Sequence, residues 1–178
     1  MSSKLPQRRS IRFANYDYSQ VGLYFVTICC ENKICRFGKI QNTDIVLNEA
    51  GRMINTEWNN LKKRFSNIEL HNYIIMPNHF HGIIEIIDVG IPLVGIRKTN
   101  GQPQGIAPTL GKILGAFKSI TTVKYTHGVT QSGWEPYNQR IWQRNYYEHI
   151  IRDEKSHQNI SDYITNNPYN WENDEYYI

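Results

Sequence analysis

The sequence predicts an α+β fold of the ferredoxin-like type, with the element order β-α-β-β-α-β. Short apolar runs rich in β-branched and aromatic residues are typical of strands, and longer segments repeat apolar residues at helical spacing. Pro77-Asn78, between two of these runs, is turn chemistry, which predicts an antiparallel pair. In this arrangement the helices cover one face of an antiparallel sheet. The opposite face, or the sheet edge, is left free for a ligand.

The strands follow from local composition. Four segments are predicted strands: residues 21–30, 68–76, 79–87 and 146–151. A short additional hairpin is predicted between Arg36 and Leu47, turning at Asn42-Thr43.

The helices follow from capping residues and apolar stripes. Asn48 is a predicted N-cap for a helix that ends near Phe65, and Thr109 is the predicted cap of a second helix. The apolar stripe of the second helix is Leu110, Ile113, Leu114, Phe117 and Ile120. We expect a surface loop over residues 90–108 and an irregular segment over residues 128–142. A last helix should run from near Asp153 to Asn167, because a residue before proline avoids helical geometry.

Length and charge limit the classes of protein that this chain can belong to. A chain of 178 residues is long enough for one domain with a real core, so we expect a single domain over residues 1–178, with a basic arm (1–17) and a C-terminal tail (169–178). Three cysteines without a CxxC pair give no disulfide framework, and no apolar run fits a signal peptide or a membrane span. A cytoplasmic protein is therefore expected.

The basic arm is a candidate contact for a polyanion. Lys4, Arg8, Arg9 and Arg12 precede the first acidic residue of the chain, and each neutralised phosphate releases counterions. The alternative is a solvated, frayed terminus.

Two histidines on one strand form the first candidate site. His79 and His81 are two apart, so both imidazoles project from the same face and can reach one metal ion. The alternative is a pair of partly buried, hydrogen-bonded histidines.

The last helix carries the second candidate site. Tyr163 and Asn167 are four apart and share one helical face, so the amide oxygen of Asn167 can serve as a third metal ligand beside the histidines. The phenol of Tyr163 then lies one turn away. Tyrosine is a covalent nucleophile in some enzymes, weak as a neutral phenol with a pKa of about 10, and a nearby cation favours the phenolate.

Four motifs in this order resemble one known family. They are Tyr24-Phe25-Val26-Thr27, the segment 72–81 (NYIIMPNHFH), the segment 142–152 (WQRNYYEHIIR) and the segment 162–168 (DYITNNP). Together they resemble the single-tyrosine HUH transposases, and in particular the REP-associated tyrosine transposases. The resemblance covers most of the chain.

The resemblance implies an HUH endonuclease-type fold and a set of roles. His79, His81 and Asn167 would hold a divalent metal, Mg²⁺ or Mn²⁺, and Tyr163 would be the nucleophile. The substrate would be single-stranded DNA, with a hairpin beside the cleavage site, cleaved and rejoined through a 5′-phosphotyrosine link. The protein would be a monomer or a homodimer acting on chromosomal DNA of a prokaryotic cytoplasm, without a membrane partner.

Further DNA contacts are expected from aromatic and basic residues near the third motif. Trp142, Tyr146 and Tyr147 are candidates for base stacking and Arg144 for a phosphate contact, whereas His149 is expected to be structural or to face the substrate. For each aromatic residue the alternative is core packing. Two other classes of function stay open: a non-catalytic or domesticated nucleic-acid-binding module, and a metal-dependent hydrolase in which water attacks and Tyr163 is a bystander.

Overall fold

Strand β1 (Gly22–Cys29) lies inside a four-stranded antiparallel sheet with the order β4-β5-β1-β6. The other strands are β4 (Ile68–Ile75), β5 (His79–Ile86) and β6 (Tyr147–Ile151). Thr27 of β1 pairs with His81 on one side and with Tyr147 on the other. The computed structural model describes residues 20–88 and 108–178, so the basic arm and nearly all of the predicted loop lie outside the described residues.

The predicted hairpin forms a separate two-stranded sheet. Strands β2 (Gly38–Gln41) and β3 (Asp44–Leu47) pair around Asn42 and Thr43, which both have positive φ, as the tightest hairpin turns require. Short 3-10 helices, η1 (Glu31–Lys33) and η2 (Trp171–Asn173), lie in the segment after β1 and in the C-terminal tail.

Helices α1 and α2 begin at their predicted caps, and α3 begins beside Asp153, where the last helix was expected to start. Side chains of Asn48, Thr109 and Asp153 accept hydrogen bonds from the first turns of α1 (Glu49–Arg64), α2 (Leu110–Ser132) and α3 (Glu154–Asn166). Helix α2 is longer than predicted and includes Gly128. Glycine is needed there because a Cβ would come within 2.2 Å of the Trp134 ring. The prediction of irregular structure from residue 128 is therefore wrong over its first five positions.

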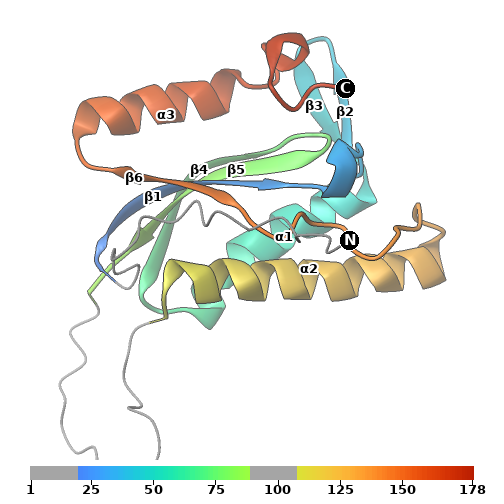
Figure 1. Ribbon diagram of the computed structural model, residues 1–178, viewed down its shortest axis with the longest axis horizontal. Coiled ribbons are helices and arrows are strands. Elements are labelled where there is room, and N and C mark those ends of the chain that lie inside the picture. Colours follow the sequence, from blue (N-terminus) through green and yellow to red (C-terminus); the bar gives the residue numbers. More distant parts are fainter. Residues whose placement is uncertain (1–19, 89–107) are drawn as a thin grey trace, which may run out of the picture.

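The helices lie on both sides of the sheet. Helices α1 and α2 cover one side and α3 covers the other (Figure 1). The first layer is the main core, in which Trp58 of α1 packs 4.5 Å from the Phe80 ring and 5.4 Å from the Phe117 ring of α2. The prediction that all helices share one face is wrong, because α3 also has an apolar side and buries it on the sheet.

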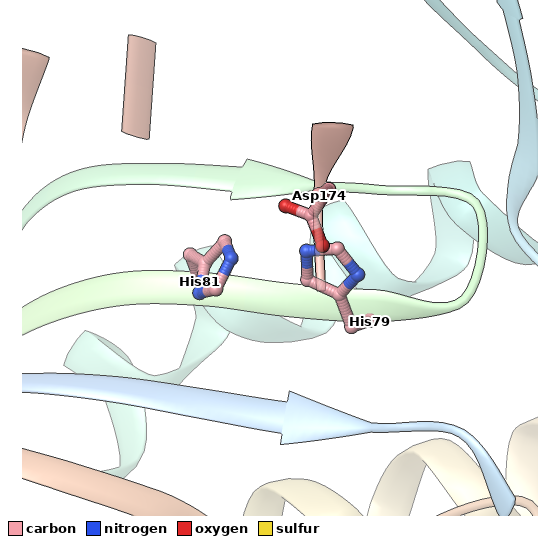
Figure 2. Close-up of side chains that lie close together, drawn as sticks. All are labelled: His79, His81 and Asp174. Carbon is pink, nitrogen blue, oxygen red and sulfur yellow. The ribbon is translucent and has the colours of Figure 1, made fainter. Parts of the chain in front are cut away.

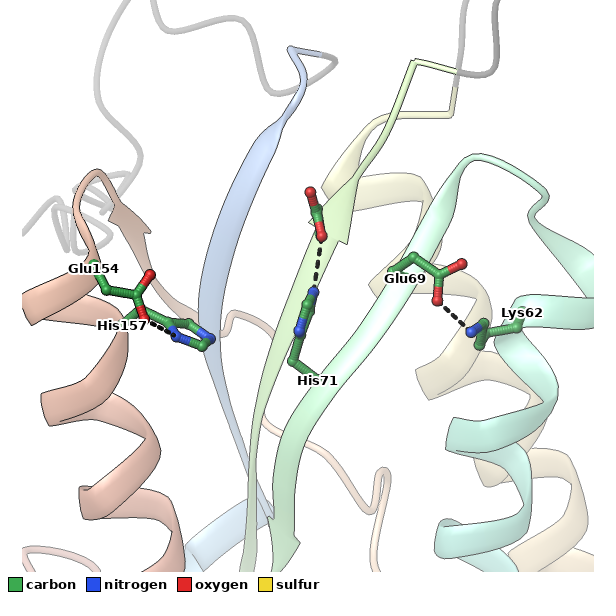
Figure 3. Close-up of polar contacts among 6 residues, drawn as sticks. Lys62, Glu69, His71, Glu154 and His157 are labelled. Atoms are coloured by element: carbon green, nitrogen blue, oxygen red, sulfur yellow. Dashed lines mark hydrogen bonds and ion pairs between the residues drawn. The ribbon is translucent and has the colours of Figure 1, made fainter.

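Helix α3 docks through a small apolar cluster and polar contacts at its N-terminal end. The cluster consists of Phe25, Ile83, Ile151 and Ile164. The His157 ring of α3 meets the His71 ring of β4 edge-on with centroids 5.9 Å apart, and His71 binds the Glu85 carboxylate at 2.9 Å (Figure 3). At the edge strand β4, Glu69 pairs with Lys62 of α1 (Figure 3). The face under α3 is thus more polar than the face under α1 and α2. Within the described residues, no helix is long and apolar enough to cross a membrane.

Candidate metal and nucleophile site

Both histidines of the H-x-H motif lie on the α3 side of β5. Their neighbours Phe80 and Gly82 face the main core, as the two-residue period of a strand requires. The ring centroids of His79 and His81 are 4.5 Å apart, and both side chains are buried (Figure 2).

Hydrogen bonds fix the tautomer of His79. Asn78 donates from Nδ2 to the carbonyl oxygens of Lys33 and Tyr176, each at 2.8 Å, so its Oδ1 faces His79. His79 Nδ1 lies 2.9 Å from that oxygen and must carry the proton. The lone pair is therefore on Nε2, which is buried and has no hydrogen-bond partner among the described residues. Metal-binding histidines are oriented by this kind of outer contact.

His81 is held by contacts from β1. Its Nδ1 lies 2.8 Å from the hydroxyl of Thr27, and its ring stacks on Phe25 with centroids 5.4 Å apart. If the Nδ1 proton is donated to Thr27, the Nε2 lone pair faces the centre of the site.

Helix α3 brings the phenol and the amide to these histidines. The Tyr163 hydroxyl lies 3.3 Å from His81 Nε2, and the Tyr163 side chain is 43% exposed. Asn167, one turn later at the C-cap, is buried. Ile160 and Ile164 pack in the apolar cluster under α3 and fix the rotation of the helix. The four residues selected from the sequence therefore meet in one place.

The C-terminal tail adds a carboxylate, that of Asp174, which was not among the residues selected from the sequence. Asn167 donates from Nδ2 to Asp174 Oδ2 at 2.8 Å, and the Tyr176 backbone N–H donates to Asp174 Oδ1 at 2.7 Å. Ligand atoms of His79, His81 and Asp174 all lie within 4.8 Å of one another (Figure 2). The sequence gives no signal for this contact, because Asp174 is seven residues after Asn167 and lies beyond the predicted helix.

The donor set fits a divalent metal ion. His79 Nε2 and Asn167 Oδ1 are both buried, and neither has a hydrogen-bond partner in residues 20–88 and 108–178, which is costly unless something binds them. Asp174 supplies the negative charge beside them. Two imidazole nitrogens with amide and carboxylate oxygens form a mixed donor set of the kind that binds divalent transition metals, whereas Mg²⁺ prefers oxygen alone.

Burial sets the protonation states of the site. It lowers the pKa of His79 to about 3, and burial together with the neighbouring His79 lowers the pKa of His81 well below its ordinary value. Both imidazoles are therefore neutral at physiological pH, as metal ligands must be. Burial, together with the negative charges of Asp174 and Glu175, raises the pKa of Tyr163 to about 12. The phenol stays protonated unless a cation offsets those charges.

The expected DNA contacts lie in different environments. Trp142 is only 3% exposed and donates from its indole to Thr121, so its ring belongs to the core. Tyr146 packs partly buried against the same core. Arg144 and His149 are exposed, as is Tyr147. The arm with Lys4, Arg8, Arg9 and Arg12 lies outside the described residues.

Comparison with solved structures shows which fold this is. The structure of a REP-associated tyrosine transposase bound to a REP hairpin superposes with a TM-score of 0.55 and 20% identity, over 90% of this chain and 73% of that one. The chain shares the fold of that protein, an α+β arrangement with an antiparallel sheet. A candidate transposase from Deinococcus radiodurans superposes with a TM-score of 0.45 and 15% identity, over 87% and 95% of the two chains, which is too low to indicate a shared fold.

Comparison of sequences gives the family. No protein-family model matches the chain. An uncharacterized protein of Haemophilus influenzae is 45% identical over 179 residues, which cover 96% of this chain and 93% of the relative. The chain therefore belongs to the same protein family as this Haemophilus influenzae protein.

Proposed function

We propose that this protein is a single-stranded DNA nicking and rejoining enzyme, a tyrosine transposase of the HUH type on a ferredoxin-like sheet. The observation that carries the proposal is the convergence at His81, where the Tyr163 phenol lies 3.3 Å from an imidazole whose neighbours are His79 and Asp174. A nucleophile beside a set of metal-binding groups is the arrangement that phosphoryl transfer needs.

Tyr163 performs the covalent step. Its Oη forms a bond to the scissile phosphorus while the bond from phosphorus to the 3′-oxygen breaks, and the phenolic proton ends on the free 3′-hydroxyl. The product is a 5′-phosphotyrosine link. Attack by a 3′-hydroxyl reverses the step and rejoins the strands. One phosphate ester replaces another, so no nucleotide cofactor is needed.

The remaining residues prepare the site for this step. His79, His81, Asn167 and Asp174 would hold Mn²⁺ or Mg²⁺, which would polarise the phosphate and offset charge that develops on it. Asn78 and Thr27 orient the two imidazoles. The part-exposed position of Tyr163 leaves its hydroxyl accessible to a strand.

The proposed substrate is single-stranded DNA beside a hairpin. A protein of the same fold has been solved with a REP hairpin bound, which supports this choice of partner. The basic arm suits the same polyanion. Candidate substrates are therefore inverted repeats next to the gene that encodes the chain.

The test is formation of a covalent adduct. Oligonucleotides from both strands of the flanking repeats are incubated with the protein and Mn²⁺, and adducts are resolved under denaturing conditions. Tyr163→Phe should reduce adduct formation by roughly 10⁴-fold or more, because the nucleophile is removed. Tyr169→Phe is the matched control, since Tyr169 is 73% exposed and lies outside the site.

The competing functions give different results in this experiment. Cleavage that survives in Tyr163→Phe would identify water as the nucleophile. Binding of hairpin DNA without an adduct on any strand would identify a non-catalytic module. Nicking that persists undiminished in excess chelator would remove the metal from the proposal.

A further inference from the structure

An open pocket lies beside Tyr163, between β6 and α3. It has a volume of about 430 Å³, within the usual range for small-ligand sites. Its lining includes Phe25 of β1, Tyr147 and His149 of β6, and Asn159 and Ile160 of α3.

The Phe25 ring lies between the pocket and the candidate site. The Phe25 ring meets the Tyr163 ring edge-on with centroids 6.2 Å apart, and it meets the Tyr147 ring in the same way at 6.3 Å. The other side of the site is covered by the tail, where the rings of Trp171 and Tyr176 lie 6.0 and 4.6 Å from that of His79. A strand that reaches the Tyr163 hydroxyl would therefore pass over Phe25 to reach Tyr147.

The spacing along α3 matches one nucleotide step. Asn159 and Tyr163 are four apart, so they share a helical face and are separated by about 6 Å along the axis. If the scissile phosphate is at Tyr163, the base of a flanking nucleotide is at the level of Asn159.

The lining has the chemistry that an unpaired base requires. Tyr147 is 47% exposed, and an exposed ring can stack on any base. Neither the Asn159 amide nor the exposed ammonium of Lys155, which also lines the pocket, has a polar partner in the part of the chain that the structure describes. An amide offers one donor side and one acceptor side, which pair with a base edge, and the ammonium suits a phosphate.

We propose that this pocket binds the nucleobase next to the scissile phosphate, stacked on Tyr147 and read at its edge by Asn159. The proposal rests on the function proposed above for its position relative to the cleaved bond. Stacking on Tyr147 and an edge contact to Asn159 both require an unpaired base, so the pocket would also favour single strands over duplex.

Binding measurements test the pocket without requiring catalysis. In a Tyr163→Phe background, fluorescence anisotropy is measured with a mixed-sequence single-stranded oligonucleotide and with the same sequences as duplex. Adding Tyr147→Ala should raise the Kd for single strands by between about five- and 150-fold and leave the duplex Kd unchanged. Asn159→Ala should change the relative affinity for strands that differ in the base at one position. Tyr169→Ala, which removes an exposed ring elsewhere, should have no effect.

Photocrosslinking locates the base directly. Oligonucleotides carrying 5-iododeoxyuridine at one position at a time should crosslink to the peptide that contains Tyr147. Crosslinks confined to the C-terminal tail or to the β2–β3 hairpin would overturn the proposal, as would equal effects of Tyr147→Ala and Tyr169→Ala.

The two proposals fail separately. If Tyr147→Ala weakens single-strand binding but the unaltered protein never forms an adduct, the pocket is correct and the nicking function is wrong. If adducts form and Tyr147→Ala changes neither binding nor crosslinking, the nicking function is correct and the pocket is wrong.

Discussion

The two faces of the sheet differ in what they bury. The face under α1 and α2 buries closely packed rings such as Trp58, Phe80 and Phe117. The face under α3 buries two imidazoles and an amide, and it leaves polar atoms of His79 and Asn167 without partners within the described part of the chain. The first face supplies the apolar burial that stabilises the fold. The second face buries polar groups at a cost in stability, which the first face offsets. This division of roles leads to three predictions.

The largest effect on stability is expected on the apolar face. Phe80→Ala should lower the free energy of unfolding by about 3–5 kcal/mol, because a buried ring is replaced by a cavity between Trp58 and Phe117. Phe25→Ala removes the same ring from the α3 face, where the space opens to the pocket, and should cost less stability. Urea denaturation of both variants measures the difference, and equal losses would contradict the division of roles.

A smaller effect on stability is expected from metal binding on the α3 face. Mn²⁺ at 100 times its Kd should stabilise the protein by about 2.7 kcal/mol, measured by thermal unfolding. Asp174→Ala should reduce this increment, whereas Asp162→Ala, which removes an exposed carboxylate on α3, should leave it intact. A full increment in Asp174→Ala would exclude Asp174 from the ligand set and leave Asn167 as the third ligand.

The third effect is on the dependence of stability on pH without metal. The folded pKa of His79 is about 3, below the unfolded value of about 6.5, so the unfolded state binds more protons between those limits. This contribution is fully present above pH 6.5 and is lost as pH falls toward 3, at about 1.4 kcal/mol per pH unit for one histidine.

Acid unfolding of variants checks this slope. His79→Gln should flatten it, whereas His127→Gln, at an exposed position of α2, should not. An unchanged slope in His79→Gln would show that this imidazole is not held neutral by the fold.

Much of the fold could be predicted because short sequence patterns determine its helix caps and the faces of its strands and helices. The caps at Asn48 and Thr109 are confirmed, since one side chain and the helix turn that follows it determine a cap, and the predicted start of the last helix near Asp153 is confirmed as well. The period of two in β5 places both imidazoles on one face, and the period of the helix places Tyr163 and Asn167 on one face. These periods hold in any tertiary structure.

What could not be predicted depends on contacts between distant segments. Helix α3 covers its side of the sheet because Ile164 completes an apolar cluster with sheet residues that are distant in the sequence. Gly128 resembles a helix end in the sequence, but its role is to make room for Trp134, whose position no local pattern gives. Asp174 reaches the histidines because the tail folds back to Asn78 and Asn167.

The alternation of side chains along β5 couples formation of the apolar core to formation of the candidate site. Phe80 and the histidines on either side of it face opposite layers, so a slip of the strand by one residue would put imidazoles against Trp58 and a phenyl ring beside Tyr163. Such a misaligned molecule loses its apolar core and does not persist as a folded but inactive species. Packing of Phe80 in the main core therefore enforces the strand register that places His79 and His81 beside Tyr163.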